Sequence, residues 1–229
     1  MRRLFLALAV CLPCLPAQAG PDLSGIWMLR GLALEGELRM TAAALELQAD
    51  YDLLIDDPSL RCEPASTSRV WANPNVRIAF DQQAERVLIS YEFFDLRRHV
   101  PLGDESAMPA APSTKNVSGV SFGRMGSSFG RYEGDRLVIE TRQHEAGYIR
   151  TSSGVPQSAE TTTVEELWRD GEVLRLRQTY RDESLFEVPF VLEYEFQRTG
   201  ETEMPLYECT DAGYDWFEKL NAPSEEDRQ

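Results

Sequence analysis

The chain has 229 residues with 38 acidic and 23 basic side chains, which gives a formal net charge of −15 at neutral pH. A field of that sign repels the phosphates of nucleic acids and anionic lipid surfaces, so we exclude a nucleic-acid partner. After the N-terminal region, no segment is long and apolar enough to span a bilayer, so we expect no membrane span.

The first 19 residues have the pattern of a secretory signal. Two early arginines precede a short apolar run over 4–12, and small residues end at Ala17-Gln18-Ala19. A buried N-terminal helix is the alternative. Cleavage after Ala19 would place the protein in the periplasm or outside the cell, and loss of the two arginines would change the formal charge from −15 to −17. We expect 20–222 to form a single β-rich domain.

Four cysteines become two if the signal is removed. The remaining pair, Cys62 and Cys209, would sit in an oxidising compartment, where an even number of cysteines indicates a disulfide bond. Such a bond would stabilise the domain by roughly 4 kcal/mol in the chain-entropy model. A metal site is the alternative, but neither cysteine has a second Cys or His close by in sequence.

Alternation of apolar and polar side chains with a period of two predicts strands. The alternating segments are 76–81, 87–93, 137–141, 174–181 and 190–197. Glu133-Gly134-Asp135 is a predicted turn, and Asp170-Gly171 is a predicted hairpin turn because both central positions must accept positive φ. One apolar face per strand, joined by tight turns, indicates an antiparallel sheet over one core.

These strands predict an all-β fold, specifically an up-and-down, lipocalin-like barrel, with a β-sandwich as second choice. Two short helices are expected, one over 41–53 with Thr41 as N-cap and one over 211–220. The irregular segments 102–130 and 143–162 are long enough to predict functional or disordered loops. The charged residues 223–229 are expected to form a disordered tail.

Several short motifs resemble a group of uncharacterised bacterial exported proteins. The matching segments are Asp22-Leu23-Ser24-Gly25-Ile26-Trp27, Asp56-Asp57-Pro58 with Cys62-Glu63-Pro64, Gly130-Arg131-Tyr132-Glu133-Gly134-Asp135-Arg136-Leu137-Val138, and Glu208-Cys209. The resemblance covers most of the chain after Ala19 and implies export, but it carries no activity.

The chain departs from that group at its histidines. The group has Gly-His-Ser where this chain has Gly126-Ser127-Ser128, and Gly-His-Pro-His-Ser where it has 154–158, Gly-Val-Pro-Gln-Ser. If those histidines bind metal or transfer protons, this chain lacks them. The resemblance therefore gives no support to a metal or histidine mechanism.

Only His99 and His144 are present, so a multi-histidine metal site is excluded and we expect no cofactor. His144 opens an irregular segment just after a strand and is close in sequence to Glu140. A histidine beside a carboxylate is a candidate general acid or base, so these two residues are the catalytic candidates. An inert loop histidine and a solvent-facing strand glutamate are the simpler interpretations.

Arginines and aromatic residues of the strand region are the candidates for ligand binding. They are Arg77, Arg98, Arg131, Tyr91 and Trp71. Arginine binds carboxylates and phosphates through two parallel hydrogen bonds, and aromatic walls suit an apolar cavity. Ordinary surface ion pairing with the many acidic residues is the alternative.

Together these features predict an exported protein that binds a small apolar or amphipathic ligand in a β-barrel cavity. A hydrolase, lyase or isomerase on the same barrel, using His144 with a strand carboxylate, is the first alternative. An envelope structural or interaction protein is the second. The sequence determines neither the ligand nor the oligomeric state.

Overall fold

The computed structural model describes residues 20–209. The predicted signal at 1–19, the predicted helix at 211–220 and the predicted tail at 223–229 lie outside these described residues. Among residues 20–209, none of the helices has the length and apolar character needed to cross a bilayer.

Twelve strands are present within residues 20–209. They are β1 Gly25–Glu35, β2 Arg77–Gln82, β3 Arg86–Tyr91, β4 Leu96–Pro101, β5 Thr114–Asn116, β6 Ser127–Glu133, β7 Arg136–Arg142, β8 Gly147–Arg150, β9 Val155–Gln157, β10 Thr162–Asp170, β11 Val173–Arg181 and β12 Phe190–Arg198. Each of the five alternating segments of the sequence coincides with a strand, because one face of each packs on the core, although Val76 precedes β2, and Glu92 and Phe93 follow the end of β3.

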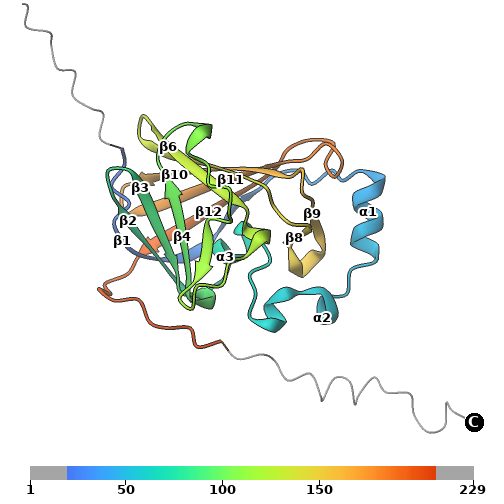
Figure 1. The fold of residues 1–229 in the computed structure, drawn as a ribbon, viewed down its shortest axis with the longest axis horizontal. Coiled ribbons are helices and arrows are strands. Elements are labelled where there is room, and N and C mark those ends of the chain that lie inside the picture. Colours follow the sequence, from blue (N-terminus) through green and yellow to red (C-terminus); the bar gives the residue numbers. More distant parts are fainter. Residues whose placement is uncertain (1–19, 210–229) are drawn as a thin grey trace, which may run out of the picture.

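Ten of the strands form one curved antiparallel sheet, in the order β5-β4-β3-β2-β1-β12-β11-β10-β7-β6 (Figure 1). Strands β8 and β9 pair separately as a hairpin. Most neighbours in the large sheet are also neighbours in the sequence, and the pairing of β1 with β12 joins the early and late parts of the chain. The predicted all-β, antiparallel class is confirmed.

The sheet order does not close into a barrel. Its end strands β5 and β6 share no hydrogen-bonded ladder. Isolated contacts connect the two ends instead: Leu102 bridges Gly130, and the Gly103 and Ser113 amides donate to the carbonyls of Gly130 and Gly126 at 2.8 and 3.0 Å. The fold is therefore a strongly curved up-and-down sheet, and a closed lipocalin-like barrel is not confirmed.

Two hairpin turns lie at or next to the positions that the sequence predicts. Gly134 follows β6 at φ 61°, and Gly171 follows β10 at φ 60°. In the second hairpin, Asp170 pairs with Val173, so the two loop residues are Gly171 and Glu172. The turn is thus one residue later than predicted, with glycine at the only loop position that has positive φ.

The predicted helix at 41–53 is divided into two. Helix α1 (Ala42–Ala49) begins at Thr41, whose hydroxyl accepts from the Ala44 amide at 3.2 Å, as predicted. A second short helix, α2 (Leu53–Asp56), follows with Asp52 as its own N-cap. Because Asp52 caps better than it continues a helix, the chain restarts there.

A third helix, α3 (Thr67–Trp71), was missed because five residues give too little periodicity. Its N-cap Ser66 accepts from the Arg69 amide at 3.1 Å. Its side chains reach the inner face of the sheet, where Thr67 and Ser68 contact the hydroxyls of Tyr180 and Tyr194 at 3.2 and 3.1 Å. Helix α3 therefore packs on the concave side of β11 and β12.

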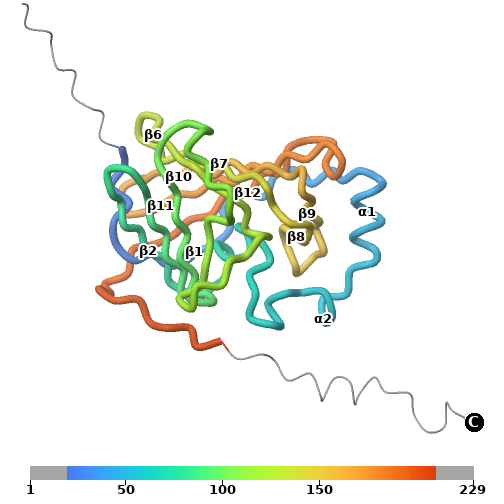
Figure 2. Tube along the Cα trace, viewed as in Figure 1, coloured from blue at the N-terminus to red at the C-terminus, as the bar shows by residue number. Residues whose placement is uncertain are grey.

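The two predicted irregular segments contain short elements. They are η3 Glu105–Ala107, β5, η4 Gly123–Met125 and the start of β6 in the first segment, and β8, η5 Thr151–Ser153 and β9 in the second. Figures 1 and 2 show the β8–β9 hairpin between the large sheet and helices α1 and α2.

The cysteine pairing is confirmed. Cys62 and Cys209 form a disulfide with their Cα atoms 5.9 Å apart. Cys62 ends a 3₁₀ turn, η1 (Pro58–Arg61), and adopts a left-handed conformation at φ 58°. The bond fixes the segment after β12 beside the turn that follows α2, near the bottom of the view in Figure 2.

Candidate functional site

Three of the predicted ligand-binding residues converge in the interior. Arg98, Tyr91 and Trp71 come from β4, β3 and α3, and all are fully buried. Arg98 and Trp71 share a partner, the fully buried Glu165 of β10, and Tyr91 contacts Arg98 and the Trp71 ring. The sequence placed the three residues in one region but did not identify the carboxylate that brings them together.

The contacts around Glu165 are short. Arg98 Nη2 donates to Glu165 Oε2 at 2.5 Å, and Trp71 Nε1 donates to Glu165 Oε1 at 2.6 Å. Gln178 Nε2 also donates to Oε1, at 3.2 Å. A carboxylate removed from water needs such donors, because an unpaired buried charge is strongly destabilising.

Arg98 has further partners on two more strands. Its guanidinium donates to the hydroxyls of Ser128 at 2.9 Å and Thr141 at 2.7 Å, and these hydroxyls lie 3.0 Å apart. Tyr91 Oη lies 3.5 Å from Nη1. Because the network joins β3, β4, β6, β7 and β10, it connects the two ends of the sheet across the interior.

Burial and charge determine the ionisation of this network. Burial alone would lower the pKa of Arg98, but the Glu165 carboxylate beside it raises that pKa above its ordinary value. Burial also raises the pKa of Tyr91. Arg98 therefore stays a cation and Tyr91 a neutral phenol, which suits a fixed ion pair enclosed by hydroxyl groups.

Glu165 left a signal in the sequence. Along β10, Thr163, Glu165 and Leu167 share the buried face, and Glu165 lies opposite Gln178 of β11. A polar residue aligned with apolar ones on an inward face predicts a buried partner. Identification of that partner requires the strand order.

Arg77 and Arg131 do not join this cluster. Arg77 pairs with Glu92 at 3.4 Å and Glu201 at 2.6 Å. Arg131 pairs with Glu133 at 2.5 Å and Glu140 at 2.6 Å. Each guanidinium therefore has carboxylate partners on the outer side of the sheet.

His144 and Glu140, the two catalytic candidates, have different partners and do not contact each other through a hydrogen bond. His144 is 2% exposed, with Nδ1 3.1 Å from the Arg124 carbonyl and Nε2 3.3 Å from the Thr163 hydroxyl. Burial lowers the pKa of His144 to about 4, so the ring is neutral at pH 7. Glu140 instead pairs with two arginines, Arg131 and Arg142. Within the described residues no hydrogen bond joins the two catalytic candidates.

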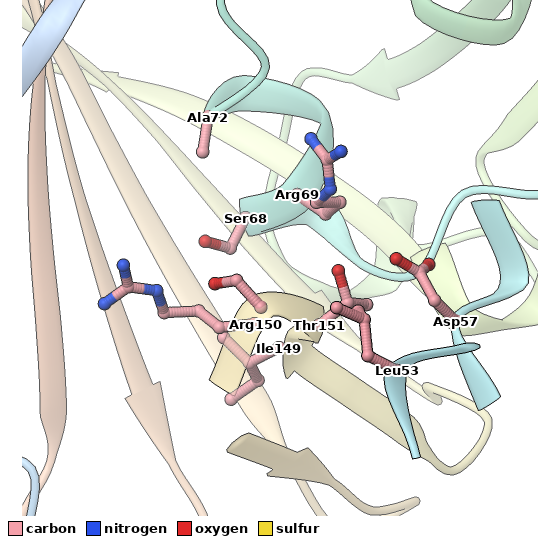
Figure 3. A pocket seen from close by; sticks show the side chains of 9 residues that line it. Leu53, Asp57, Ser68, Arg69, Ala72, Ile149, Arg150 and Thr151 are labelled. Atoms are coloured by element: carbon pink, nitrogen blue, oxygen red, sulfur yellow. The ribbon is translucent and has the colours of Figure 1, made fainter. Parts of the chain in front are cut away.

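A pocket of about 330 Å³ opens between helix α3, the α2 region and the end of β8. Its wall combines apolar, hydroxyl and charged side chains: Leu53, Asp57, Ser68, Arg69, Ala72, Ile149, Arg150, Thr151 and Ser152. Figure 3 shows these residues arranged around it, with Arg69 and Asp57 on one side and Arg150 extending away on the other. We call this the α3 pocket.

The inner wall of the α3 pocket is buried and held by a hydrogen bond between α3 and β8. Ser68 is 1% exposed and Ile149 is fully buried, and the Ser66 hydroxyl donates to the Ile149 carbonyl at 2.8 Å. These contacts fix α3 to β8. A pocket preformed in this way needs little reordering to accept a ligand.

Within residues 20–209, no group of three or more histidine, cysteine, aspartate or glutamate side chains has a geometry that could hold a metal ion. No protein-family model matches the chain, and a search of the curated proteins gives no match. The fold and the sites thus define a curved antiparallel β protein with a buried ion pair at its centre and a preformed pocket beside α3.

Proposed function

We propose that the protein is an exported small-molecule-binding protein whose ligand occupies the α3 pocket. The observation that carries this proposal is the pocket itself. Its volume of about 330 Å³ is within the range of small-ligand sites, and it combines an apolar wall with a few polar groups. We place the ligand beside α3 because Trp71, Tyr91 and Arg98 occupy the interior of the sheet.

The buried polar groups favour binding over catalysis. Arg98 and Glu165 have no exposed surface, and His144 is 2% exposed. A general acid or base must come within hydrogen-bond reach of its substrate. The residues that line the α3 pocket include hydroxyl groups and arginines, which suit recognition of a ligand, and they include no histidine.

The test is titration with N-phenyl-1-naphthylamine, an uncharged dye that fluoresces in apolar sites. We expect saturable binding to the wild-type protein at one site. Ser152→Trp places a large side chain at an exposed position of the pocket wall and should weaken binding at least tenfold.

Ser118→Trp is the matched control, because Ser118 is also exposed but does not line the pocket. It should leave the dissociation constant within twofold of wild type. Absence of saturable binding, or equal effects of the two tryptophans, would overturn the proposal. Export is tested separately, by the mass of the protein from the periplasmic fraction, which should lack residues 1–19.

A further inference from the structure

We propose that the ligand of the α3 pocket is an amphipathic organic anion whose acidic group is bound by Arg69. This inference rests on the proposed function and adds the chemical class of the ligand. It follows from how the charged side chains of the pocket are already engaged, and from how Arg69 is held.

Two of the three charged residues of the pocket have partners in the protein. Arg150 forms an ion pair with Glu35, and its side chain extends away from the other lining groups (Figure 3). Asp57 is 5% exposed and accepts from the Ser59 amide at 2.9 Å. Neither group is therefore fully available to a ligand.

Arg69 differs from both. None of the ion pairs formed within residues 20–209 at 4.0 Å or less involves Arg69, although the chain has 38 acidic residues. Its side chain is half-buried and lines the pocket. A guanidinium with free donors forms paired hydrogen bonds with a carboxylate, sulfonate or phosphate group.

Aromatic packing fixes the position of Arg69. Its guanidinium carbon lies 5.1 Å from the centre of the Phe93 ring. Phe93 in turn stacks on Phe94 at 3.8 Å and meets the edge of Tyr207 at 5.2 Å. A cation held over an aromatic face loses less conformational freedom when an anion binds, so the site is organised in advance.

The rest of the wall suits the apolar part of the ligand. Leu53, Ala72 and Ile149 supply the apolar surface. Asp57 is the only carboxylate lining the pocket; it lies on the same side as Arg69 (Figure 3), and its Oδ1 accepts from the Ser59 amide. Arg69 is the lining cation without a carboxylate partner among residues 20–209, so we assign the acidic group to Arg69 and the apolar body to the surface of Leu53, Ala72 and Ile149.

The test compares two dyes that differ by one charged group. 1-Anilinonaphthalene-8-sulfonate is the anionic counterpart of the uncharged N-phenyl-1-naphthylamine. With Arg69→Gln we expect at least a tenfold weaker dissociation constant for the anionic dye and less than a twofold change for the neutral one. Arg69→Lys, which keeps the charge but not the planar donor pair, should have an intermediate effect on the anionic dye.

Arg86→Gln is the matched control, since Arg86 is an exposed arginine at the start of β3 that does not line the pocket. It removes the same charge and should leave both dissociation constants unchanged. If Arg69→Gln alters both dyes equally or neither, the assignment of an anion to Arg69 is wrong while the binding function stands. If neither dye binds the wild type at one site, the proposed function fails as well.

Discussion

Arg98 and Glu165, 67 residues apart in the sequence, meet at 2.5 Å with both side chains fully buried. The pair joins β4, the second strand of the sheet order, to β10, the eighth of the ten. It is therefore a fixed contact across the interior of a sheet whose edges are not joined by a ladder. Removal of either partner leaves the other charge without compensation.

We predict that Arg98→Met lowers the free energy of unfolding by about 3–5 kcal/mol, because Glu165 would remain buried without its counter-ion. Urea unfolding followed by tryptophan fluorescence measures the change. Arg39→Met is the matched control, since the Arg39–Glu187 pair is about half exposed and should contribute at most about 1 kcal/mol. Equal losses in the two variants would contradict a special role for the buried pair.

The double variant Arg98→Met with Glu165→Gln tests the origin of that loss. A neutral amide oxygen can still accept from Trp71 and Gln178, and no buried charge remains. We expect the double variant to be more stable than Arg98→Met alone, since much of the single-variant loss comes from the unpaired carboxylate. A double variant less stable than the single one would show that Glu165 is needed as an anion.

His144 predicts a pH dependence of stability. Burial lowers its pKa to about 4 in the folded protein, against an ordinary value near 6.5. The unfolded chain binds the proton first, so stability is full above pH 6.5 and falls as the pH drops toward 4. Between pH 7.5 and pH 5 we expect a loss of about 2 kcal/mol from this residue.

The measurement is urea unfolding of wild type and His144→Gln across that range. The variant cannot titrate, so its stability should decrease by about 2 kcal/mol less than that of the wild type between the two pH values. Parallel curves would mean that another group causes the dependence.

The disulfide joins residues separated by 147 positions, and its removal should destabilise the protein by about 4–5 kcal/mol in the chain-entropy model. We expect a reductant to shift the urea midpoint strongly downward. Cys62→Ala with Cys209→Ala should have the same lowered midpoint and be insensitive to reductant. If the midpoint of the wild type does not move while both thiols become reactive, the bond has no role in stability.

Gly126 is a position where side chains should not be tolerated. Its φ is 65°, and a Cβ there would lie 2.6 Å from the Arg142 carbonyl oxygen and 2.9 Å from His144 Nδ1. We predict that Gly126→Ala destabilises the protein by about 3 kcal/mol or more, from both backbone strain and a clash with main chain.

Gly134→Ala is the comparison without the clash. Gly134 has a φ of 61° and open space around the added Cβ, whereas Gly126 combines φ 65° with ψ −173°, a region that essentially only glycine adopts, so its backbone strain is also larger. The Gly134→Ala variant should lose only about 1–2 kcal/mol, the strain of a left-handed residue. Thermal unfolding of both variants provides the comparison, and equal losses would mean that local movement relieves both the strain and the clash at Gly126.

The strands could be predicted because their signal is local. Burial of one face imposes a period of two on each segment, as in the run from Val87 to Tyr91, and a glycine of positive φ marks the β6–β7 and β10–β11 turns. The disulfide could also be predicted, because two cysteines outside the predicted signal allow a single pairing. Helix α3 could not be predicted, because five residues give no usable period.

The site depended on tertiary structure. The sequence selected Arg98, Tyr91 and Trp71 but grouped them with Arg77 and Arg131, which carry the same charge and lie on similar strands. Whether an arginine is buried with Glu165 or paired with surface glutamates depends on which face of the strand it occupies and on which strands are adjacent. The α3 pocket likewise exists only after α3 and β8, about 80 residues apart, have packed together.

The sequence by itself therefore determined the strands, the glycine turns and the crosslink of this protein, because neighbouring residues set backbone preference and alternation, and two cysteines outside the predicted signal allow one pairing. Only the folded sheet decided which charges are buried, which are paired and which remain available to a ligand. Those properties depend on the low dielectric of the interior and on partners from distant segments of the chain. A short stretch of sequence contains neither of them.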